Sequence, residues 1–266
     1  MFNDHLAQEG GAEKVLEVLS EMYPEAPIYT LMYDKEKTDR NLPGKKIEAS
    51  IIQRLPGGLR FYRWYMPLMP MAVEFFDLRN FDIVLSDTSS FAKGVITSPD
   101  TLHVCYCHTP TRYVWSDTHQ YINELHYNKY FKKIISLVIN YIRIWDRQAA
   151  DRVDAFIANS ATVKKRIKKY YRRDSHIIYP SIEEEKYYVS DPSQVGDFFL
   201  SGSRLVPYKR HDIVIQACKE LGFKLKVFGD GIDMDRLKEI AGDDPNIELL
   251  GRISQSVKDK LYSTCK

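Results

Sequence analysis

The sequence predicts an α/β protein with two halves, each built on a parallel sheet. Short apolar runs rich in β-branched residues alternate with helix-length amphipathic segments, which is typical of parallel strands joined by helical crossovers. The alternation stops once, in a polar and acidic stretch at residues 181–196, and then starts again. The length of 266 residues also fits two ordinary domains.

The first half opens with a glycine pair and a helix. Gly10 and Gly11 stand directly before an amphipathic helix expected at residues 12–22. A glycine loop that opens a helix usually follows a strand, but residues 1–7 make a poor strand, so we expect the first strand to be largely missing. Strands and helices then alternate, with strands at residues 81–86, 102–107, 155–158 and 176–179 and helices at residues 124–150 and 161–171.

The second half continues the same alternation after the polar stretch. We place the domain boundary within that stretch, so that the domains are residues 1–182 and 183–266. Ligands of such sheets bind at the carboxyl ends of the strands, and we therefore expect a ligand cleft between the two halves. The elements of the second half are strands at residues 197–201, 224–228 and 246–250 and helices at residues 212–221, 234–241 and 254–266.

Composition excludes several functional classes. The 38 Lys and Arg residues nearly balance the 36 Asp and Glu residues, which argues against a polybasic nucleic-acid binder. The four cysteines include no C-x-x-C pair, and they are typical of a protein from a reducing compartment. The first eleven residues lack the apolar core of a signal peptide, and the most apolar run, residues 134–142, is far shorter than the roughly 20 residues of a membrane span. We therefore expect a cytoplasmic protein.

A basic loop at residues 202–210 carries the strongest candidate chemistry. It follows a predicted strand and precedes a predicted helix, so it lies on the rim where ligands of such sheets bind. Arg204 and Lys209, in a loop stiffened by Pro207, can converge on a diphosphate through charge-assisted hydrogen bonds without a metal ion. The alternative is an ordinary solvated loop, because Lys and Arg prefer water.

A second cluster could be read as a metal site, since His103, Cys105, Cys107 and His108 lie close together in the sequence. In a strand, however, the first three side chains share one face and His108 turns to the other. We therefore expect no metal site.

Six short motifs together resemble a known family. They are, in chain order, Gly10-Gly11-Ala12-Glu13-Lys14, Cys107-His108-Thr109-Pro110, Asn159-Ser160 before a basic helix, Ser-Arg-Leu-Val-x-x-Lys-Arg from residue 203, Gly229-Asp230-Gly231 and Leu250-Gly251-Arg252. In this order they resemble the family-4 retaining glycosyltransferases of the GT-B fold, and within them the mannosyltransferase-like group that acts in surface polysaccharide or glycolipid synthesis. The resemblance covers essentially the whole chain.

The resemblance implies two Rossmann-like domains that face each other across a cleft. Residues 1–182 would form the acceptor side, and residues 183–266 would bind the nucleotide sugar. The implied reaction moves a hexose from a nucleotide diphosphate-sugar to a saccharide or lipid-linked acceptor, with retention and without a metal ion or another cofactor. GDP-mannose is the favoured donor, and a UDP-sugar is the alternative.

The resemblance also implies roles for individual residues. Arg204 and Lys209 would hold the diphosphate and stabilise the charge of the leaving group, and His108 would lie near the transferred sugar. Gly10 and Gly11 would let the backbone approach the donor, helped by the helix N-terminus that follows. The residues bordering the nucleoside would be Gly229, Gly231, Arg252 and Ile253. The structural alternatives are an ordinary glycine loop, a structural histidine and a common strand-to-helix turn.

The chain departs from the family pattern at both ends. The family has a strand ahead of the glycine loop, and it carries a Glu-x7-Glu pair beyond the point where this sequence stops. We therefore expect a chain truncated at both ends, and the alternative function is a non-catalytic module that binds a nucleotide or sugar phosphate. No G-x-x-x-x-G-K-[ST] or G-x-G-x-x-G motif occurs, which argues against a P-loop or NAD-dependent enzyme.

Two basic regions suggest peripheral contact with an anionic membrane. Residues 51–71 contain three arginines among aromatic residues and no acidic residue. The predicted helix at residues 161–171 and the residues after it present a second basic face, for which an ordinary solvated helix face is the alternative. The basic residues of this second region are Lys164, Lys165, Arg166, Lys168, Lys169, Arg172 and Arg173.

Overall fold

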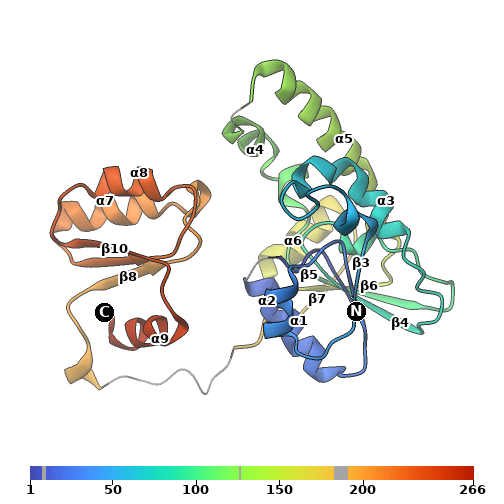
Figure 1. Cartoon of the computed structure of the whole chain (residues 1–266), viewed down its shortest axis with the longest axis horizontal. Coiled ribbons are helices and arrows are strands. Elements are labelled where there is room, and N and C mark those ends of the chain that lie inside the picture. The colour runs from blue at the N-terminus through green and yellow to red at the C-terminus, as the bar shows by residue number, and fades with distance from the viewer. Residues whose placement is uncertain (8–9, 126, 183–190) are drawn as a thin grey trace. The chain divides into compact units, whose positions relative to one another are not determined.

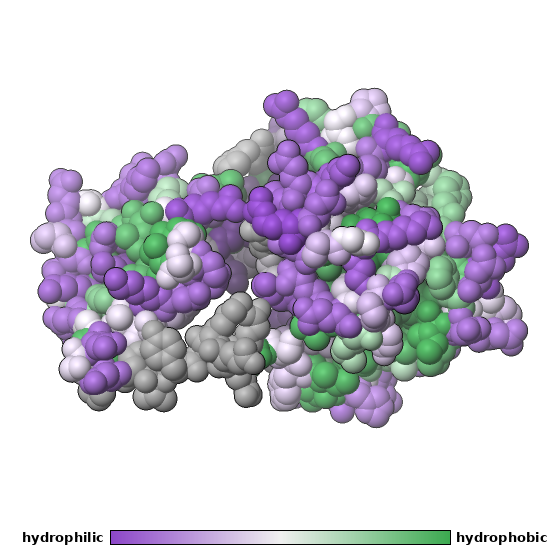
Figure 2. All heavy atoms as spheres, turned by 60° about the horizontal axis from the view of Figure 1, so that its bottom comes forward, coloured by the Kyte–Doolittle hydropathy of each residue, from purple (hydrophilic) through white to green (hydrophobic). Residues whose placement is uncertain are grey.

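The computed structural model describes residues 1–7, 10–125, 127–182 and 191–266. The chain divides into two compact units, Met1–Ser181 (unit 1) and Ile182–Lys266 (unit 2), and each has its own parallel sheet and its own core (Figure 1). Residues 183–190 of the predicted linker lie outside the described residues. On the face of the molecule shown in Figure 2, hydrophilic side chains predominate and hydrophobic ones form separate patches.

Unit 1 contains a seven-stranded sheet in the order β3-β2-β1-β4-β5-β6-β7. Every strand pairs in parallel with its neighbours, which confirms the predicted α/β class. The strands are β1 (Phe2–Asn3), β2 (Ile28–Thr30), β3 (Ile47–Ala49), β4 (Ile83–Thr88), β5 (Leu102–Cys107), β6 (Ala155–Ala158) and β7 (His176–Ile177).

The segment before the glycine pair does contribute a strand, contrary to the expectation for residues 1–7. The two-residue strand β1 lies between β2 and β4. The side chain of Phe2 is fully buried, and the Asn3 side-chain amide donates a hydrogen bond of 2.9 Å to the carboxylate of Asp87 on β4. Burial of one ring and one buried hydrogen bond thus hold a segment that lacks the alternating pattern of a longer strand.

The helices of unit 1 differ from the prediction in number and in one start. The helices are α1 (Gly11–Met22), α2 (Lys35–Asn41), α3 (Met69–Glu74), α4 (Thr118–Glu124), α5 (Lys129–Asp151) and α6 (Ala161–Tyr170). The sequence did not predict α2, α3 and α4, and the helix expected at residues 124–150 begins at Lys129, because the Asn128 side chain accepts hydrogen bonds from the backbone N–H groups of Tyr130 and Phe131 and so caps its start.

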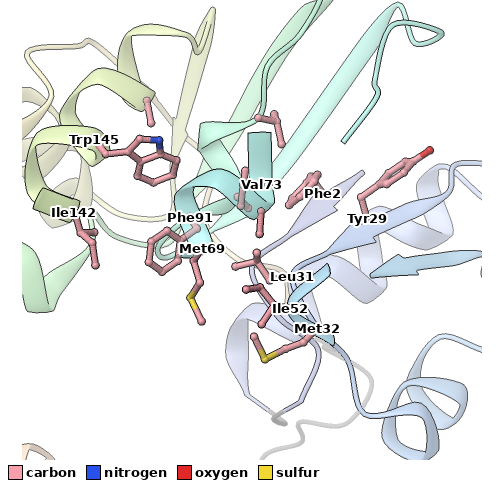
Figure 3. Close-up of a cluster of buried hydrophobic side chains, with 14 of the residues drawn as sticks. Phe2, Tyr29, Leu31, Met32, Ile52, Met69, Val73, Phe91, Ile142 and Trp145 are labelled. Carbon is pink, nitrogen blue, oxygen red and sulfur yellow. The ribbon is translucent and has the colours of Figure 1, made fainter. Parts of the chain in front are cut away.

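The largest core of unit 1 lies where α3 and α5 pack on the sheet (Figure 3). Trp145 and Ile142 of α5 point toward Phe91 and Met69, and Phe2 of β1 lies beside Val73. Burial of such large side chains away from water is the main stabilising contribution to this unit.

Unit 2 contains a three-stranded parallel sheet in the order β10-β9-β8. The helix predicted to run to the last residue ends at Thr264, because Cys265 is extended and the backbone N–H of Lys266 donates instead to Phe198 O, at 3.0 Å. The elements of unit 2 are β8 (Phe199–Gly202), α7 (His211–Leu221), β9 (Leu225–Phe228), α8 (Met234–Ala241), β10 (Ile247–Gly251) and α9 (Gln255–Thr264).

Candidate functional site

Three of the predicted motifs meet at one edge of the sheet of unit 2. Each follows the carboxyl end of a strand: the basic loop follows β8, the Gly-Asp-Gly turn follows β9, and Arg252 follows β10. Backbone hydrogen bonds join them, because Leu205 N–H donates to Asp230 O and Gly229 N–H donates to Gly251 O, both at 2.8 Å. The carboxyl edge of a parallel sheet is where ligands of α/β proteins bind.

The two glycines of the turn allow this close packing. A Cβ atom on Gly229 would lie 1.8 Å from the carbonyl oxygen of Ser203, and one on Gly231 would lie 2.1 Å from that of Leu205. Gly229 also has a φ of 128°, which other residues rarely adopt. The turn therefore supports the basic loop by backbone contact, and larger residues would push the two apart.

The two residues predicted to bind the diphosphate, Arg204 and Lys209, both lie next to Tyr208. Arg204 Nη2 lies 3.3 Å from the hydroxyl of Tyr208, and Lys209 Nζ lies 5.8 Å from the centre of the same ring. Both cations are exposed on the loop, which includes the short helix η7 (Pro207–Lys209). Two positive charges around one exposed ring form a site that a diphosphate can reach from solvent.

His211, which the sequence analysis missed, holds the basic loop in place. Its Nδ1 lies 2.9 Å from the hydroxyl oxygen of Ser201 on β8, and its Nε2 lies 2.8 Å from that of Ser203 in the loop. Burial, with the nearby charge of Lys209, lowers the pKa of His211 below its usual value, so the ring is neutral at pH 7. The sequence feature that could have identified His211 is its position directly after the basic loop, at the start of the predicted helix.

In unit 1, the predicted active-site histidine is paired with a carboxylate. His108 lies just after β5, and its Nε2 is 2.6 Å from Oδ1 of Asp87 on the neighbouring strand β4. The Asp87 side chain is only 1% exposed, and the amide of Asn3 donates to its other oxygen. Asp87 and Asn3 were not predicted from the sequence, because neither stands in a motif.

The charge state of His108 is set by this pair. Burial alone lowers the pKa of His108, but the hydrogen bond and charge of Asp87, with smaller contributions from Asp4 and Glu13, raise it above the usual value. The pairing also fixes the ring orientation, with Nε2 facing Asp87 and Nδ1 turned away from it.

The glycine pair lies at the N-terminus of α1. Gly10 is the N-cap residue, with extended backbone and no side-chain cap of its own, and Gly11 begins the helix. A Cβ atom on Gly11 would meet no atom within 4 Å among the residues that the structure describes. Glu13, in the first turn, is close enough to His108 to influence its pKa, so the helix start and the histidine belong to one region of unit 1.

The His103–His108 segment does not form a metal cluster in the part of the chain that the structure describes. Within that part, no group of three or more His, Cys, Asp or Glu side chains is placed to hold a metal ion. Cys105 and Cys107 are fully buried in the core, and His103 Nε2 lies 2.8 Å from the hydroxyl of Ser86.

The structure thus brings the predicted site residues together in two groups. The group in unit 1 consists of Gly10, Gly11 and His108. The group in unit 2 consists of Arg204, Lys209, Gly229, Gly231, Arg252 and Ile253.

Comparison with known proteins identifies the family. Residues 9–186, about two thirds of the chain, match the family model described as Glycosyltransferase Family 4. No functionally curated protein sequence shows significant similarity to the chain.

Two solved structures show the fold. The Anabaena protein HepE, solved with UDP and glucose, is 18% identical, with a TM-score of 0.63 over 99% of this chain and 71% of its own. The lipopolysaccharide outer core galactosyltransferase WaaB, solved without ligand, is 14% identical, with a TM-score of 0.55 over 97% of this chain and 68% of its own. The predicted GT-B fold class is confirmed. The chain belongs to glycosyltransferase family 4.

Proposed function

We propose that the protein binds the diphosphate of a nucleotide sugar on the basic loop of unit 2 and transfers its hexose to a saccharide or lipid-linked acceptor with retention. The observation that carries this proposal is the arrangement of Arg204 and Lys209 around Tyr208, on a loop packed against the Gly229–Gly231 turn. Membership of glycosyltransferase family 4 supports the reaction class.

The cations of the loop would act on the leaving group. When the bond to the sugar breaks, negative charge develops on the nucleoside diphosphate, and fixed cations lower the energy of that state. Arg204 would donate from its planar guanidinium, while Lys209 would act as a compact charge. Because His211 holds Ser203, the residue before Arg204, the loop need not reorganise when the ligand arrives.

The region around His108 would serve the sugar. With its pKa raised above the usual value, His108 carries a proton at pH values where an unpaired histidine has lost it, and it can donate a hydrogen bond to a sugar oxygen. The N-terminus of α1, at Gly10 and Gly11, would offer backbone N–H groups to the donor.

GDP-mannose is the donor we propose, on the resemblance to mannosyltransferases. A UDP-sugar is the alternative, because the structurally similar HepE was solved with UDP and glucose. The role proposed for the protein is in surface polysaccharide or glycolipid synthesis, at the cytoplasmic side. A nucleotide-binding protein without transferase activity is the second candidate, and incubation of the chain with donor and acceptor separates the two.

Calorimetric titration tests the binding site directly. We expect GDP or UDP to bind with and without EDTA, and a change on adding EDTA would contradict a metal-free site. Arg204→Ala and Lys209→Ala should each weaken diphosphate binding about tenfold, since a hydrogen bond to a charged group contributes roughly 1.5–3 kcal/mol. Binding of the nucleoside alone should not change. Lys238→Ala, at an exposed lysine on α8, is the matched control.

A further inference from the structure

Helix α5 exposes an apolar stripe along much of its length. Five large side chains, spaced three or four residues apart and therefore on one face, are each at least half exposed. Leu137 is the most exposed of them, at 72%. The residues of the stripe are Tyr130, Ile134, Leu137, Tyr141 and Ile144.

This stripe is separate from the face of α5 that packs in the core. Ile139, Ile142 and Trp145 are buried, and Figure 3 shows Ile142 and Trp145 pointing into the cluster around Phe91. The first half of α5 stands clear of the sheet of unit 1, together with α4 (Figure 1). Packing within unit 1 therefore accounts for one apolar face of the helix and leaves the other unexplained.

The apolar surface continues onto a neighbouring segment. Trp64, in the short helix η2 (Tyr62–Leu68), is 56% exposed, and its ring lies 5.8 Å from that of Phe131 on α5. Tyr and Trp, which combine an apolar ring with a polar atom, are the residues typical of membrane–water interfaces. Trp64 and the five stripe residues are called the α5 surface below.

The two segments that carry the α5 surface have charged residues of one sign, apart from the acidic Glu124 at the end of α4. Lys129 and Lys133 are exposed on α5, and residues 125–145 contain no acidic residue. Residues 51–71, which include Trp64, contain three arginines and no acidic residue either. An apolar stripe bordered by cations is the pattern of a helix that lies in the headgroup region of an anionic membrane.

We propose that the α5 surface docks the protein on membranes that contain anionic lipids, with α5 lying along the interface. Among the helices of the described ranges, none has both the length and the hydropathy to cross a bilayer. A second copy of the chain is the less favoured occupant, because a two-fold contact would place this surface against itself, and residues 125–145 offer Lys129 and Lys133 no carboxylate to pair with. The proposal concerns a surface away from the nucleotide loop and does not depend on the donor.

Vesicle sedimentation tests this docking with the whole chain. We expect binding to phosphatidylcholine vesicles that contain phosphatidylglycerol, weaker binding to phosphatidylcholine alone, and loss of the difference at high salt. The double variant Ile134→Ser, Leu137→Ser should bind about a hundredfold more weakly or worse, because two aliphatic side chains no longer leave water when the protein docks. The double variant Leu221→Ser, Ile232→Ser, at exposed apolar positions of unit 2, is the matched control.

Three further measurements define the outcome. The tryptophan fluorescence of the wild type should shift to shorter wavelength on vesicle binding, and Trp64→Phe should remove this shift. Failure of the wild type to bind anionic vesicles, or equal loss in both double variants, would overturn the proposal. Sedimentation that shows a dimer, dissociated by Ile134→Ser, Leu137→Ser and indifferent to lipid, would instead assign the surface to contact between copies. Circular dichroism should show that all variants fold, since every substituted side chain is exposed.

Discussion

The two units each place a histidine at the carboxyl edge of a parallel sheet, but the two rings have opposite surroundings. His108 in unit 1 pairs with the carboxylate of Asp87, which raises its pKa above the usual value against the effect of burial. His211 in unit 2 contacts two hydroxyl groups beside Lys209, and burial and that charge lower its pKa. The same side chain therefore favours a charged form in one unit and a neutral form in the other.

The difference extends to how each edge is built. In unit 1, buried carboxylates organise the edge: Asp4, only 6% exposed, accepts hydrogen bonds from the side chain of Thr88 and the backbone N–H groups of Ser89 and Ala92. In unit 2, backbone contacts and glycines organise it, and the cations stay exposed. Buried carboxyl groups thus fix the shape of the first edge, while the second edge is held by backbone contacts and has its cations on the surface.

The largest effect should come from removing the carboxylate that organises the edge of unit 1. Asp4→Ala leaves several buried donors without an acceptor and should lower the free energy of unfolding by about 3 kcal/mol or more. Denaturant unfolding measures this loss. Asp77→Ala, which removes an exposed carboxylate paired with Arg79, is the control and should leave the free energy of unfolding almost unchanged. Equal losses in the two variants would contradict the role given to Asp4.

The next effect should come from the glycine that supports the basic loop of unit 2. Gly229→Ala places a Cβ atom against the carbonyl of Ser203 and strains the backbone, so stability should fall by roughly 1–3 kcal/mol. Binding of the nucleotide diphosphate should fall with it. Gly222→Ala is the matched control, because Gly222 also has a positive φ, but an added Cβ atom would meet no described atom within 4 Å. Unchanged diphosphate affinity in Gly229→Ala would show that the turn does not support diphosphate binding.

The pH dependence of unit 1 sharpens the comparison of the histidines. Because the folded-state pKa of His108 lies above the unfolded value of about 6.5, the stability it contributes is fully present below pH 6.5. It is lost as the pH rises through the folded-state pKa. Asp87→Asn should lower the pKa of His108 in an NMR titration and remove this loss, whereas Asp77→Asn should change neither. A pKa of His108 that is the same in wild type and Asp87→Asn would show that the pair does not set the charge.

The smallest effect is expected at His211. His211→Asn loses part of the link between β8 and the basic loop and should weaken diphosphate binding about twofold to tenfold, given roughly 0.5–1.5 kcal/mol for a neutral hydrogen bond.

The contribution of His211 to stability should change with pH in the direction opposite to that of His108. Its folded-state pKa lies below the unfolded value, so its contribution is present above about pH 6.5 and is lost as the pH falls through the folded-state pKa. Denaturant unfolding at several pH values would contradict this reading if wild type and His211→Asn lost stability equally on acidification.

The sequence predicts several of the strongly patterned elements of this fold with their bounds. The strands at residues 102–107 and 155–158 and the helix at residues 234–241 are observed with the predicted bounds. The missed strands β2 and β3 are three residues each, too short for periodicity to mark them.

The candidate site was predictable where its residues stand in motifs, and not where partners are distant in sequence. Arg204, Lys209 and the Gly229–Gly231 turn are short motifs after strands, so their common edge follows from parallel topology. Asp87 is 21 positions from His108, and Asn3 is 84 positions from Asp87. The order of strands in the folded sheet brings these side chains together, and that order cannot be inferred from the local sequence pattern.

The most direct test of the proposed donor site is the change in backbone amide NMR shifts of the whole chain when GDP or UDP is added. We predict that the largest changes fall on the amides of residues 203–205, 229–231 and 251–253, which the sheet of unit 2 brings to one edge. Changes of similar size spread over the chain, or concentrated away from these three loops, would contradict it.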